Sequence, residues 1–253
     1  MIRVQKPNAA PQRLDAGVAL VAALEHALAL DPAAGASSKT AFKFDKSVYG
    51  HTDVKNALKA AQHDKCCYCE ARVSHIAAGH VEHYRPKTCS QQAKGESLLY
   101  PGYYWLAYAW PNLYFVCERC NSSGKKNLFP LRITNHRNRR RTDDHVEEPL
   151  ILDPGGPTDP RRHIKFNGPA IVATSRIGKT TVASLGLNRI PLKTARLSHL
   201  KLCTTIRDFV RIPSASFNQA VQQEQELARQ QLARLATSEA EYSAMVGDFL
   251  ASP

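Results

Sequence analysis

The fold of this chain is decided by three stretches, KCCYCE at residues 65–70, VEHYRPK at 81–87 and YYWLAYAWPNLYFVCERCNSSGKKNLF at 103–129. They contain two Cys-x-x-C pairs, Cys66 with Cys69 and Cys117 with Cys120. Two thiolates at this spacing can reach one ion from a tight turn, and two pairs complete the tetrahedral sulfur shell that Zn²⁺ prefers. We therefore expect a structural zinc site, which contributes folding free energy and carries out no chemistry itself.

The alternatives for these cysteines are four buried thiols or a redox-active Cys-x-x-C pair. A redox pair is expected beside a βαβ pattern, which the sequence lacks. The chain has seven cysteines, an odd number that suits metal binding in a reducing compartment better than a disulfide framework. We expect the other three to be small buried hydrophobic residues, namely Cys67, Cys89 and Cys203.

The composition is that of a globular protein with a basic surface. Of 253 residues, 43% are hydrophobic, which excludes wholesale disorder. The 34 Lys and Arg residues outnumber the 22 acidic residues, and the net charge of +12 favours nucleic acid as a partner over simple solubility. The apolar run at 17–30 is too short and too interrupted for a signal peptide or a transmembrane helix. We expect a cytoplasmic protein with no membrane partner.

The patterns along the chain predict an α+β protein in three parts. Residues 1–62 form a helical segment, residues 63–135 hold the cysteine-bracketed core, and residues 136–253 form a β-hairpin and helical region that we expect to be a partner interface. In the first part, one helix begins at Asp15 as its cap and ends at Leu30, and another begins at Thr52 as its cap and reaches about residue 63. Residues 33–51 between them are predicted as a loop.

The third part begins with strand-like sequence. Residues 164–187 predict short strands with turns at Asn167-Gly168 and at Gly178. Helical spacing follows over 191–211 and again over 216–250, where a break is expected near residues 237–238.

Seven aromatic side chains gather between residues 103 and 115. They could stack on nucleic-acid bases or wall the core of a small metal-dependent fold. We favour the core, because aromatic side chains mainly contribute buried area. The seven residues are Tyr103, Tyr104, Trp105, Tyr108, Trp110, Tyr114 and Phe115.

An acidic residue followed by histidine, Glu82-His83, lies between the cysteine pairs, and Asn121 directly follows the last cysteine. Hydrolysis of a phosphodiester needs a base for the attacking water and charge stabilisation on the phosphate. His83 can take a proton from water near neutral pH. The oxygen ligands of Glu82 and Asn121 suit Mg²⁺ or Mn²⁺. Each residue alone would be ordinary, and it is their joint placement that predicts a catalytic site.

One geometric condition attaches to Glu82 and His83. Adjacent residues of a regular strand face opposite sides, so both can serve one site only at a strand end or a bulge. Arg85-Pro86 follows directly and favours a strand end, since proline interrupts a ladder. We expect Asn112 to hold His83 in place. The alternative bases or ligands nearby are His75 and His80.

Several basic residues flank this constellation and are expected to contact the phosphates of nucleic acid. For the run at 132–141, an ordinary solvated loop is the alternative. The predicted contacts are Arg85, Lys87, Lys125, Lys126, Arg137, Arg139, Arg140 and Arg141.

The segment from residue 66 to residue 125 resembles the HNH endonuclease motif. His83 corresponds to its first histidine, Asn112 to its middle asparagine and Asn121 to its terminal residue, while Glu82 stands where aspartate is more common. The pattern continues with KKNLFPL at 125–131, PLILDPGGPTDPRRHIKF at 149–166 and SLGLNR at 184–189. Over about residues 52–190, the chain is similar to the PtuB-type HNH effectors of Septu and retron anti-phage systems.

The resemblance implies a ββα-metal core stapled by a zinc ion on the four cysteines, and the helical spacing on either side predicts N- and C-terminal helices around it. It implies that His83 is the base, that Asn112 supports it, and that Glu82 and Asn121 bind the catalytic Mg²⁺ or Mn²⁺. It further implies an endonuclease with a PtuA-type ATPase partner in phage defence. Lys125 is one residue further from Asn121 than in the commonest Asn-x-x-Lys ending.

These inferences predict a phosphodiester hydrolase whose substrate is DNA, with RNA as the other choice. The alternative is a zinc-stabilised module that binds nucleic acid or a partner without cutting it. The complete Glu-His, Asn and Asn set favours the enzyme, because binding alone would not require it.

Overall fold

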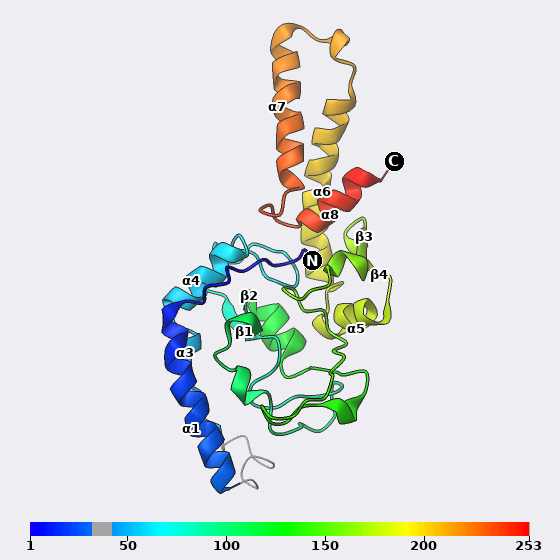
Figure 1. Ribbon diagram of the computed structural model, residues 1–253. Helices are drawn as coiled ribbons and strands as arrows, with labels where there is room; N and C mark the ends of the chain where they lie inside the picture. Colours follow the sequence, from blue (N-terminus) through cyan, green and yellow to red (C-terminus); the bar gives the residue numbers. More distant parts are fainter. Residues whose placement is uncertain (32–41, 253) are drawn as a thin grey trace.

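The computed structural model describes residues 1–31 and 42–252, so residues 33–41 of the predicted loop at 33–51 lie outside the described residues. The described chain is a mixed α+β structure, as predicted. Its strands form two small antiparallel pairs near the middle, and helices lie at both ends of the chain (Figure 1).

The N-terminal segment contains α1 (Ala16–Leu30), α3 (Lys46–Tyr49) and α4 (Thr52–Ala61). α1 is confirmed, but the prediction that Asp15 caps it is wrong. Asp15 is itself helical, because it ends a 3-10 turn (Gln12–Asp15) that runs directly into α1, and its side chain accepts no capping hydrogen bond.

The start of α4 also differs from the prediction. The cap is His51, whose Nδ1 accepts a hydrogen bond from the Asp53 amide at 3.2 Å, and Thr52 is already the first helical residue. The short helix α3 lies in the predicted loop. It forms because Asp45 caps it, with Oδ1 accepting from the Ser47 amide at 2.7 Å.

The central part is built on two short strands, β1 (His80–His83) and β2 (Leu113–Val116), which pair antiparallel. Glu82 lies opposite Tyr114 and His83 opposite Leu113. A π-helix, η5 (Arg119–Lys125), follows β2 after two residues. The order is therefore strand, strand and helix. Short 3-10 turns lie between β1 and β2 at Tyr104–Leu106 and Trp110–Asn112, and another follows η5 at Thr134–His136.

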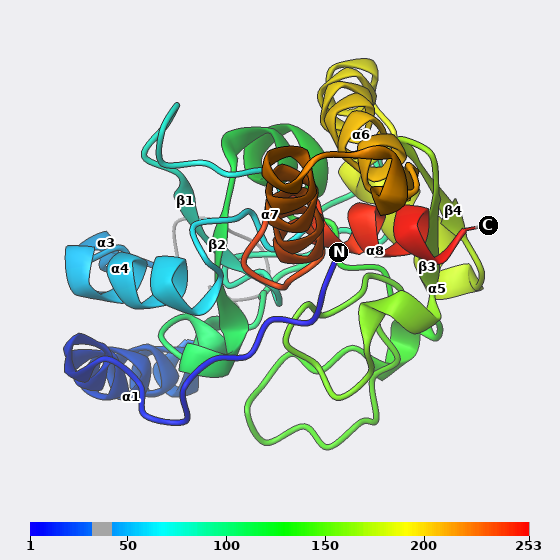
Figure 2. The ribbon, with the colours of Figure 1, turned by 90° about the horizontal axis from the view of Figure 1, so that it is seen from above.

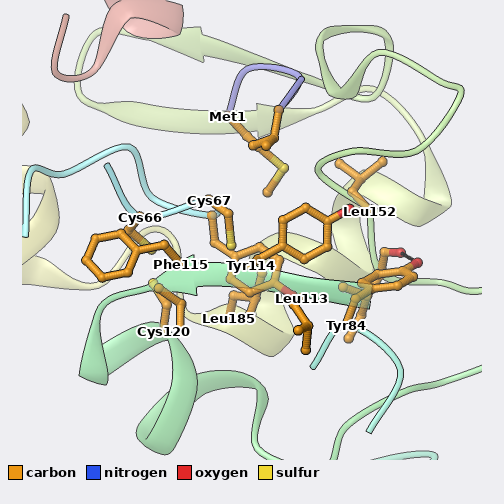
Figure 3. Close-up of a cluster of buried hydrophobic side chains, with 14 of the residues drawn as sticks. Met1, Cys66, Cys67, Tyr84, Leu113, Tyr114, Phe115, Cys120, Leu152 and Leu185 are labelled. Atoms are coloured by element: carbon orange, nitrogen blue, oxygen red, sulfur yellow. Dashed lines mark hydrogen bonds between the residues drawn. The ribbon is translucent and has the colours of Figure 1, made fainter. Parts of the chain in front are cut away.

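The aromatic residues between 103 and 115 build the core, as predicted, and do not form a base-stacking surface. All of them are buried except Trp105, which is half-buried. β2 crosses the middle of this cluster, where the side chains of Leu113, Tyr114 and Phe115 contact surrounding elements (Figure 3). The leftover cysteines Cys67, Cys89 and Cys203 are buried as well.

The C-terminal part begins with a 3-10 turn (Pro160–Arg162) and a hairpin of β3 (Ile164–Asn167) and β4 (Ala170–Ala173), whose turn at Asn167-Gly168 is confirmed. The second predicted turn, at Gly178, is wrong. Residues 176–185 form α5 (Arg176–Leu185), in which the Ser175 side chain accepts a hydrogen bond from the Gly178 amide. The β-branched residues there have strand propensity, but burial of Thr181 and Leu185 on one face favours the helix.

Two long helices then form an antiparallel hairpin that projects from the rest of the molecule (Figure 1). They are α6 (Ile190–Arg211) and α7 (Gln219–Leu235), joined through a 3-10 turn at Ser214–Ser216. The predicted break after α7 is confirmed, and α8 (Ser243–Ala251) returns to pack against β3. The Asp248 carboxylate accepts a hydrogen bond from the Phe166 amide at 2.6 Å.

The three predicted parts share one hydrophobic core. It contains Val21 and Leu58 from the first part, Phe115 from the second, and Leu185 and Met245 from the third. Viewed from above, α1, α3 and α4 lie on one side of β1 and β2, and α5, α6 and α8 lie on the other (Figure 2). Among the described helices, none has the length and hydropathy that a membrane span requires.

Candidate active site and metal centre

The four predicted zinc ligands come together. The Sγ atoms of Cys66, Cys69, Cys117 and Cys120 all lie within 4.8 Å of one another, and those of Cys69 and Cys117 are 3.9 Å apart. A tetrahedral shell with Zn–S bonds of about 2.3 Å separates its sulfur atoms by about 3.8 Å. The cluster is therefore compatible with a zinc ion, and the sulfur ligand set is the one that zinc prefers.

The cysteines join two parts of the chain that are far apart in sequence. Cys66 and Cys69 lie in the turn after α4, where the Glu70 amide donates to the Cys66 carbonyl at 3.0 Å. Cys117 follows β2, and Cys120 lies in η5. Arg189, at the start of α6, lies with both terminal guanidinium nitrogens 3.7 Å from Cys120 Sγ. Sequence reasoning missed this arginine, whose positive charge complements a thiolate cluster.

Glu82 and His83 meet the geometric condition that the sequence raised. His83 is the last residue of β1, and both side chains are buried. Both also line one cavity of about 350 Å³, together with His80, Lys87 and Asn121. The strand end thus lets two adjacent residues reach the same space.

The surroundings of His83 define its tautomer. Its Nε2 lies 2.9 Å from the Ala107 carbonyl, which can only accept a hydrogen bond, so Nε2 carries the proton. Nδ1 therefore carries a lone pair, which faces the Lys87 ammonium at 3.4 Å. Burial, with the nearby charge of Lys87, holds the pKa of His83 well below its usual value. His83 is therefore a neutral imidazole that is able to accept a proton at Nδ1.

Two residues close over this imidazole. Lys87 Nζ lies 3.4 Å from Nδ1, and the Tyr49 ring stands edge-on to the imidazole with 4.8 Å between centroids. Lys87 also lies over the Tyr49 ring, 4.6 Å from its centroid. Burial lowers the pKa of Lys87 to about 8, although Glu82 opposes this. Tyr49 comes from α3, and the sequence contained no signal that this turn would reach the site.

Lys125 has a different position from the one expected of a phosphate contact. It is fully buried, its Nζ donates to the His83 carbonyl at 3.0 Å, and it lies 2.7 Å from Glu82 Oε1. The extra residue between Asn121 and Lys125 is accommodated by the π-helix, in which the Lys126 amide donates to the Asn121 carbonyl five residues back. The wider turn directs Lys125 into the interior.

The ion pair leaves coordination capacity on Glu82. The Lys125 ammonium lies 2.7 Å from Oε1 and occupies one side of that oxygen. Burial raises the pKa of Glu82, and the charge of Lys125 opposes that shift. An ionised carboxylate has about four lone-pair sites, so one ion pair with Lys125 leaves acceptor capacity on Glu82 for another cation.

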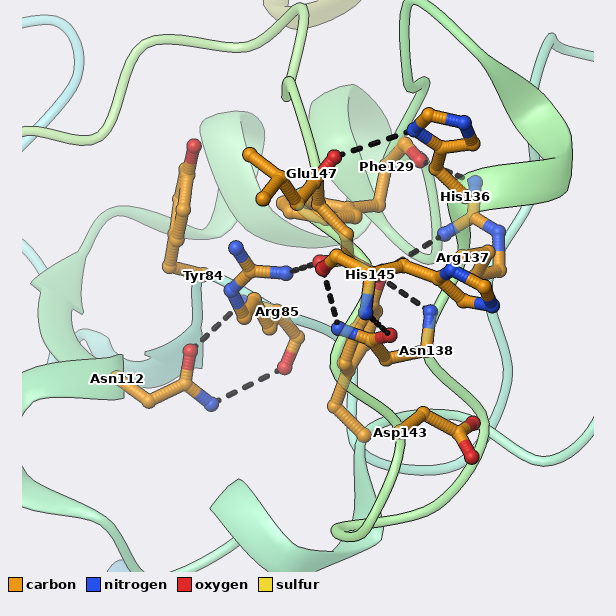
Figure 4. Close-up of polar contacts among 12 residues, drawn as sticks. Tyr84, Arg85, Asn112, Phe129, His136, Arg137, Asn138, Asp143, His145 and Glu147 are labelled. Atoms are coloured by element: carbon orange, nitrogen blue, oxygen red, sulfur yellow. Dashed lines mark hydrogen bonds and ion pairs between the residues drawn. The ribbon is translucent and has the colours of Figure 1, made fainter.

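Asn112 supports His83 through the backbone and does not touch its ring. Its Oδ1 accepts from the Arg85 amide at 2.7 Å, and its Nδ2 donates to the carbonyls of Arg85 and Leu106, both at 3.1 Å (Figure 4). Leu106 precedes Ala107, whose carbonyl holds the imidazole. Asn112 therefore ties the end of β1 to the turn that orients His83.

Replacing Asn112 with alanine is expected to lower the free energy of unfolding by about 1–3 kcal/mol, because buried backbone groups lose their partners. Urea denaturation of the purified chain measures this change. Asn135→Ala, at an exposed position, is the matched control. Equal unfolding free energies for the two variants would contradict the role given to Asn112.

The other predicted phosphate contacts divide between interior and surface. The buried guanidinium of Arg137 donates to the Phe129 carbonyl at 2.7 Å and to Tyr103 at 3.1 Å. Arg85 pairs with the buried carboxylate of Glu147 (Figure 4). Lys126 is exposed and lines the cavity with Glu82. A second cavity of about 600 Å³ beside α1 is lined by three exposed arginines, Arg139, Arg140 and Arg141.

Comparison with known proteins gives two related sequences. Septu protein PtuB of Bacillus mycoides (strain KBAB4) is 36% identical over 168 residues, which is 64% of this chain. Septu protein PtuB of Bacillus thuringiensis is 33% identical over 147 residues, which is 57% of this chain. The chain is homologous to Septu protein PtuB. This confirms the predicted resemblance to PtuB, while the HNH assignment stays a prediction.

The homology to PtuB is partial. The matched regions are 57% and 44% of the two PtuB sequences, so the chain spans about half the length of the curated relatives it matches. No family model matches the chain, and no solved structure matches it.

Proposed function

We propose that this chain is a divalent-metal-dependent endonuclease of the HNH type that acts in an anti-phage system of the Septu kind. The observation that carries the proposal is the neutral His83, anchored through Nε2 to Ala107, in one cavity with Glu82 and Asn121. A base and two oxygen ligands in one cavity are the groups that phosphodiester hydrolysis needs.

In this mechanism His83 is the general base. A water molecule beside Nδ1 gives up a proton to the lone pair and attacks the phosphorus atom, while the bond from phosphorus to the leaving sugar oxygen breaks and that oxygen takes a proton from solvent water. The Ala107 carbonyl accepts from Nε2–H throughout, so it keeps the tautomer and stabilises the imidazolium that forms. Lys87 faces Nδ1 in this structure, so in this mechanism its ammonium has to leave that nitrogen before the water can bind there.

The residues present fit a hard divalent ion. The Glu82 carboxylate has acceptor capacity beyond its ion pair with Lys125, and no described residue donates to Asn121 Oδ1. Oxygen ligands of this kind suit Mg²⁺ or Mn²⁺, which would supply charge stabilisation to the phosphate. Glu82 and Asn121 would hold the ion, while Lys125 balances the carboxylate charge from the interior.

In this proposal β1, β2 and η5 are the ββα-metal core, and a zinc ion on the four cysteines holds it together. Cys117 directly follows β2 and Cys120 lies in η5, so an ion shared with Cys66 and Cys69 would set the position of Asn121, which follows Cys120 directly. The divalent ion and the zinc thus have separate tasks, one in hydrolysis and one in folding.

The substrate in this proposal is DNA, with RNA as the alternative. Lys46, Lys55, Lys87 and Lys126 line the cavity, and their charge suits a phosphate backbone. The homology to PtuB supports a defence role and a partner ATPase of the PtuA type.

The test is a cleavage assay of the chain, alone and purified with a PtuA-type ATPase, on DNA and on RNA. We expect cleavage that requires Mg²⁺ or Mn²⁺ and stops on chelation. Nucleic-acid binding without cleavage in either preparation, at both metals, would contradict the nuclease and support the zinc-stabilised binding module instead.

The Lys87→Gln variant is expected to shift the acid limb of the kcat/KM–pH profile, which reports the pKa values of the free enzyme, to higher pH. The charge of Lys87 lowers the pKa of His83, so its removal lets that pKa rise. Because neutral His83 is the active form, a higher pKa protonates the base at a higher pH. Lys126→Gln, which removes an exposed lysine from the same cavity, is expected to leave the limb in place. An unchanged limb in Lys87→Gln would contradict this electrostatic link.

A further inference from the structure

The side-chain amide of Asn121 is held on one side only. Its Nδ2 lies 3.1 Å from Nδ1 of His80, and no described residue donates to its Oδ1. An amide nitrogen can only donate, so His80 Nδ1 carries a lone pair and accepts this hydrogen bond. This hydrogen bond therefore places the amide nitrogen toward His80 and leaves Oδ1 on the opposite side.

His80 reaches this place because of the strand period. It lies two residues before Glu82 in β1, and residues two apart on a strand point to the same face. His80, Glu82 and Asn121 line the same cavity, and the His80 side chain is exposed there. This position places the exposed imidazole of His80 beside Asn121, the proposed metal ligand.

We propose that His80 is a positioning residue that orients the Asn121 amide so that Oδ1 is presented to the divalent ion. This inference rests on the proposed function. An amide ligates a hard cation through oxygen and not through nitrogen, so a freely rotating Asn121 would present the wrong atom for part of the time. Partners that orient a ligand in this way typically change metal affinity by about 10- to 100-fold.

The expected result is that His80→Ala raises the Mn²⁺ dissociation constant by about 10- to 100-fold. Isothermal titration calorimetry and Mn²⁺ electron paramagnetic resonance on the zinc-loaded full chain measure this constant. His80→Asn is the rescue variant, because its Oδ1 stands close to the place of Nδ1 and can accept from Asn121. We expect His80→Asn to bind Mn²⁺ nearly as well as the original chain.

Two controls make the result specific. His75→Ala removes an exposed histidine from the same segment and is expected to leave Mn²⁺ affinity unchanged. In a double-mutant cycle, His80→Ala is expected to have no further effect once Asn121 is alanine, because His80 acts only through that amide. Zinc content and melting temperature are expected to stay constant in all His80 variants.

The failure of this inference is separable from failure of the proposed function. If the original chain binds Mn²⁺ and Asn121→Ala weakens it, but His80→Ala does not, the positioning role is wrong. The same holds if His80→Asn behaves like His80→Ala, because His80 would then be a ligand itself. If the original chain shows no Mn²⁺ site that depends on Asn121, the proposed metal site is wrong and this inference fails with it.

Discussion

Replacing His83 with alanine is expected to reduce nucleic-acid cleavage by a factor of about 10²–10⁴, the usual contribution of a general base. The ring is a neutral imidazole held by Ala107, with Nδ1 toward the cavity, and alanine removes the only atom proposed to accept the proton. The measurement is the single-turnover cleavage rate at saturating Mg²⁺ or Mn²⁺, so that the affinity for metal does not enter.

The controls separate loss of the base from loss of the fold. Zinc content is expected to stay unchanged, because His83 does not touch the cysteine cluster. His83→Gln fills more of the buried site than alanine and is expected to lose the same activity, which excludes a simple cavity effect. His75→Ala is expected to cleave normally. If His83→Ala cuts as fast as the original chain, His83 is not the base.

Replacing Cys66 with serine is expected to remove the zinc and to unfold the central part of the chain. Structural zinc sites contribute apparent binding energies of about 10–16 kcal/mol, which is comparable to or larger than the whole stability of a domain at about 5–15 kcal/mol. Metal analysis is expected to find one zinc per chain before the substitution and none after it. Thermal unfolding followed by circular dichroism is expected to lose its cooperative transition.

Cys67 provides the matched control, since it is the adjacent residue and equally buried but lies outside the cluster. Cys67→Ala is expected to keep one zinc and a cooperative transition at a somewhat lower temperature. Where Cys66→Ser is insoluble, removal of zinc from the original chain with a strong chelator gives the same readout. Cooperative unfolding in the zinc-free chain would show that the four cysteines do not stabilise the fold.

Short-range signals in the sequence predicted most of the elements. The spacing of apolar residues located α1 and α6, and the Asn167-Gly168 turn located the hairpin of β3 and β4. The errors arose where a local preference competed with burial. Residues 176–185 have β-branched side chains, yet they form a helix because one face of it packs into the core.

Positive charge in the sequence predicted the residues of the site least well. Arg137 and Lys125 were predicted to contact phosphate, and both are buried among polar partners. A sequence records how many positive charges a segment carries but not which of them meets a buried carbonyl or carboxylate. That depends on the packing of segments that are distant in sequence, and for the same reason Tyr49, Ala107 and Arg189 were missed.

The sequence by itself determined which residues could form a zinc cluster and which could form a Glu-His-Asn site, because residue type and close spacing define ligand chemistry. It also determined that the aromatic stretch would be core, since large apolar side chains are buried. Only the tertiary structure decided that Glu82 and His83 share one cavity, because that requires β1 to end at His83. It alone decided which atom of each side chain is hydrogen-bonded, since Nε2 of His83 meets the Ala107 carbonyl and Nδ2 of Asn121 meets Nδ1 of His80.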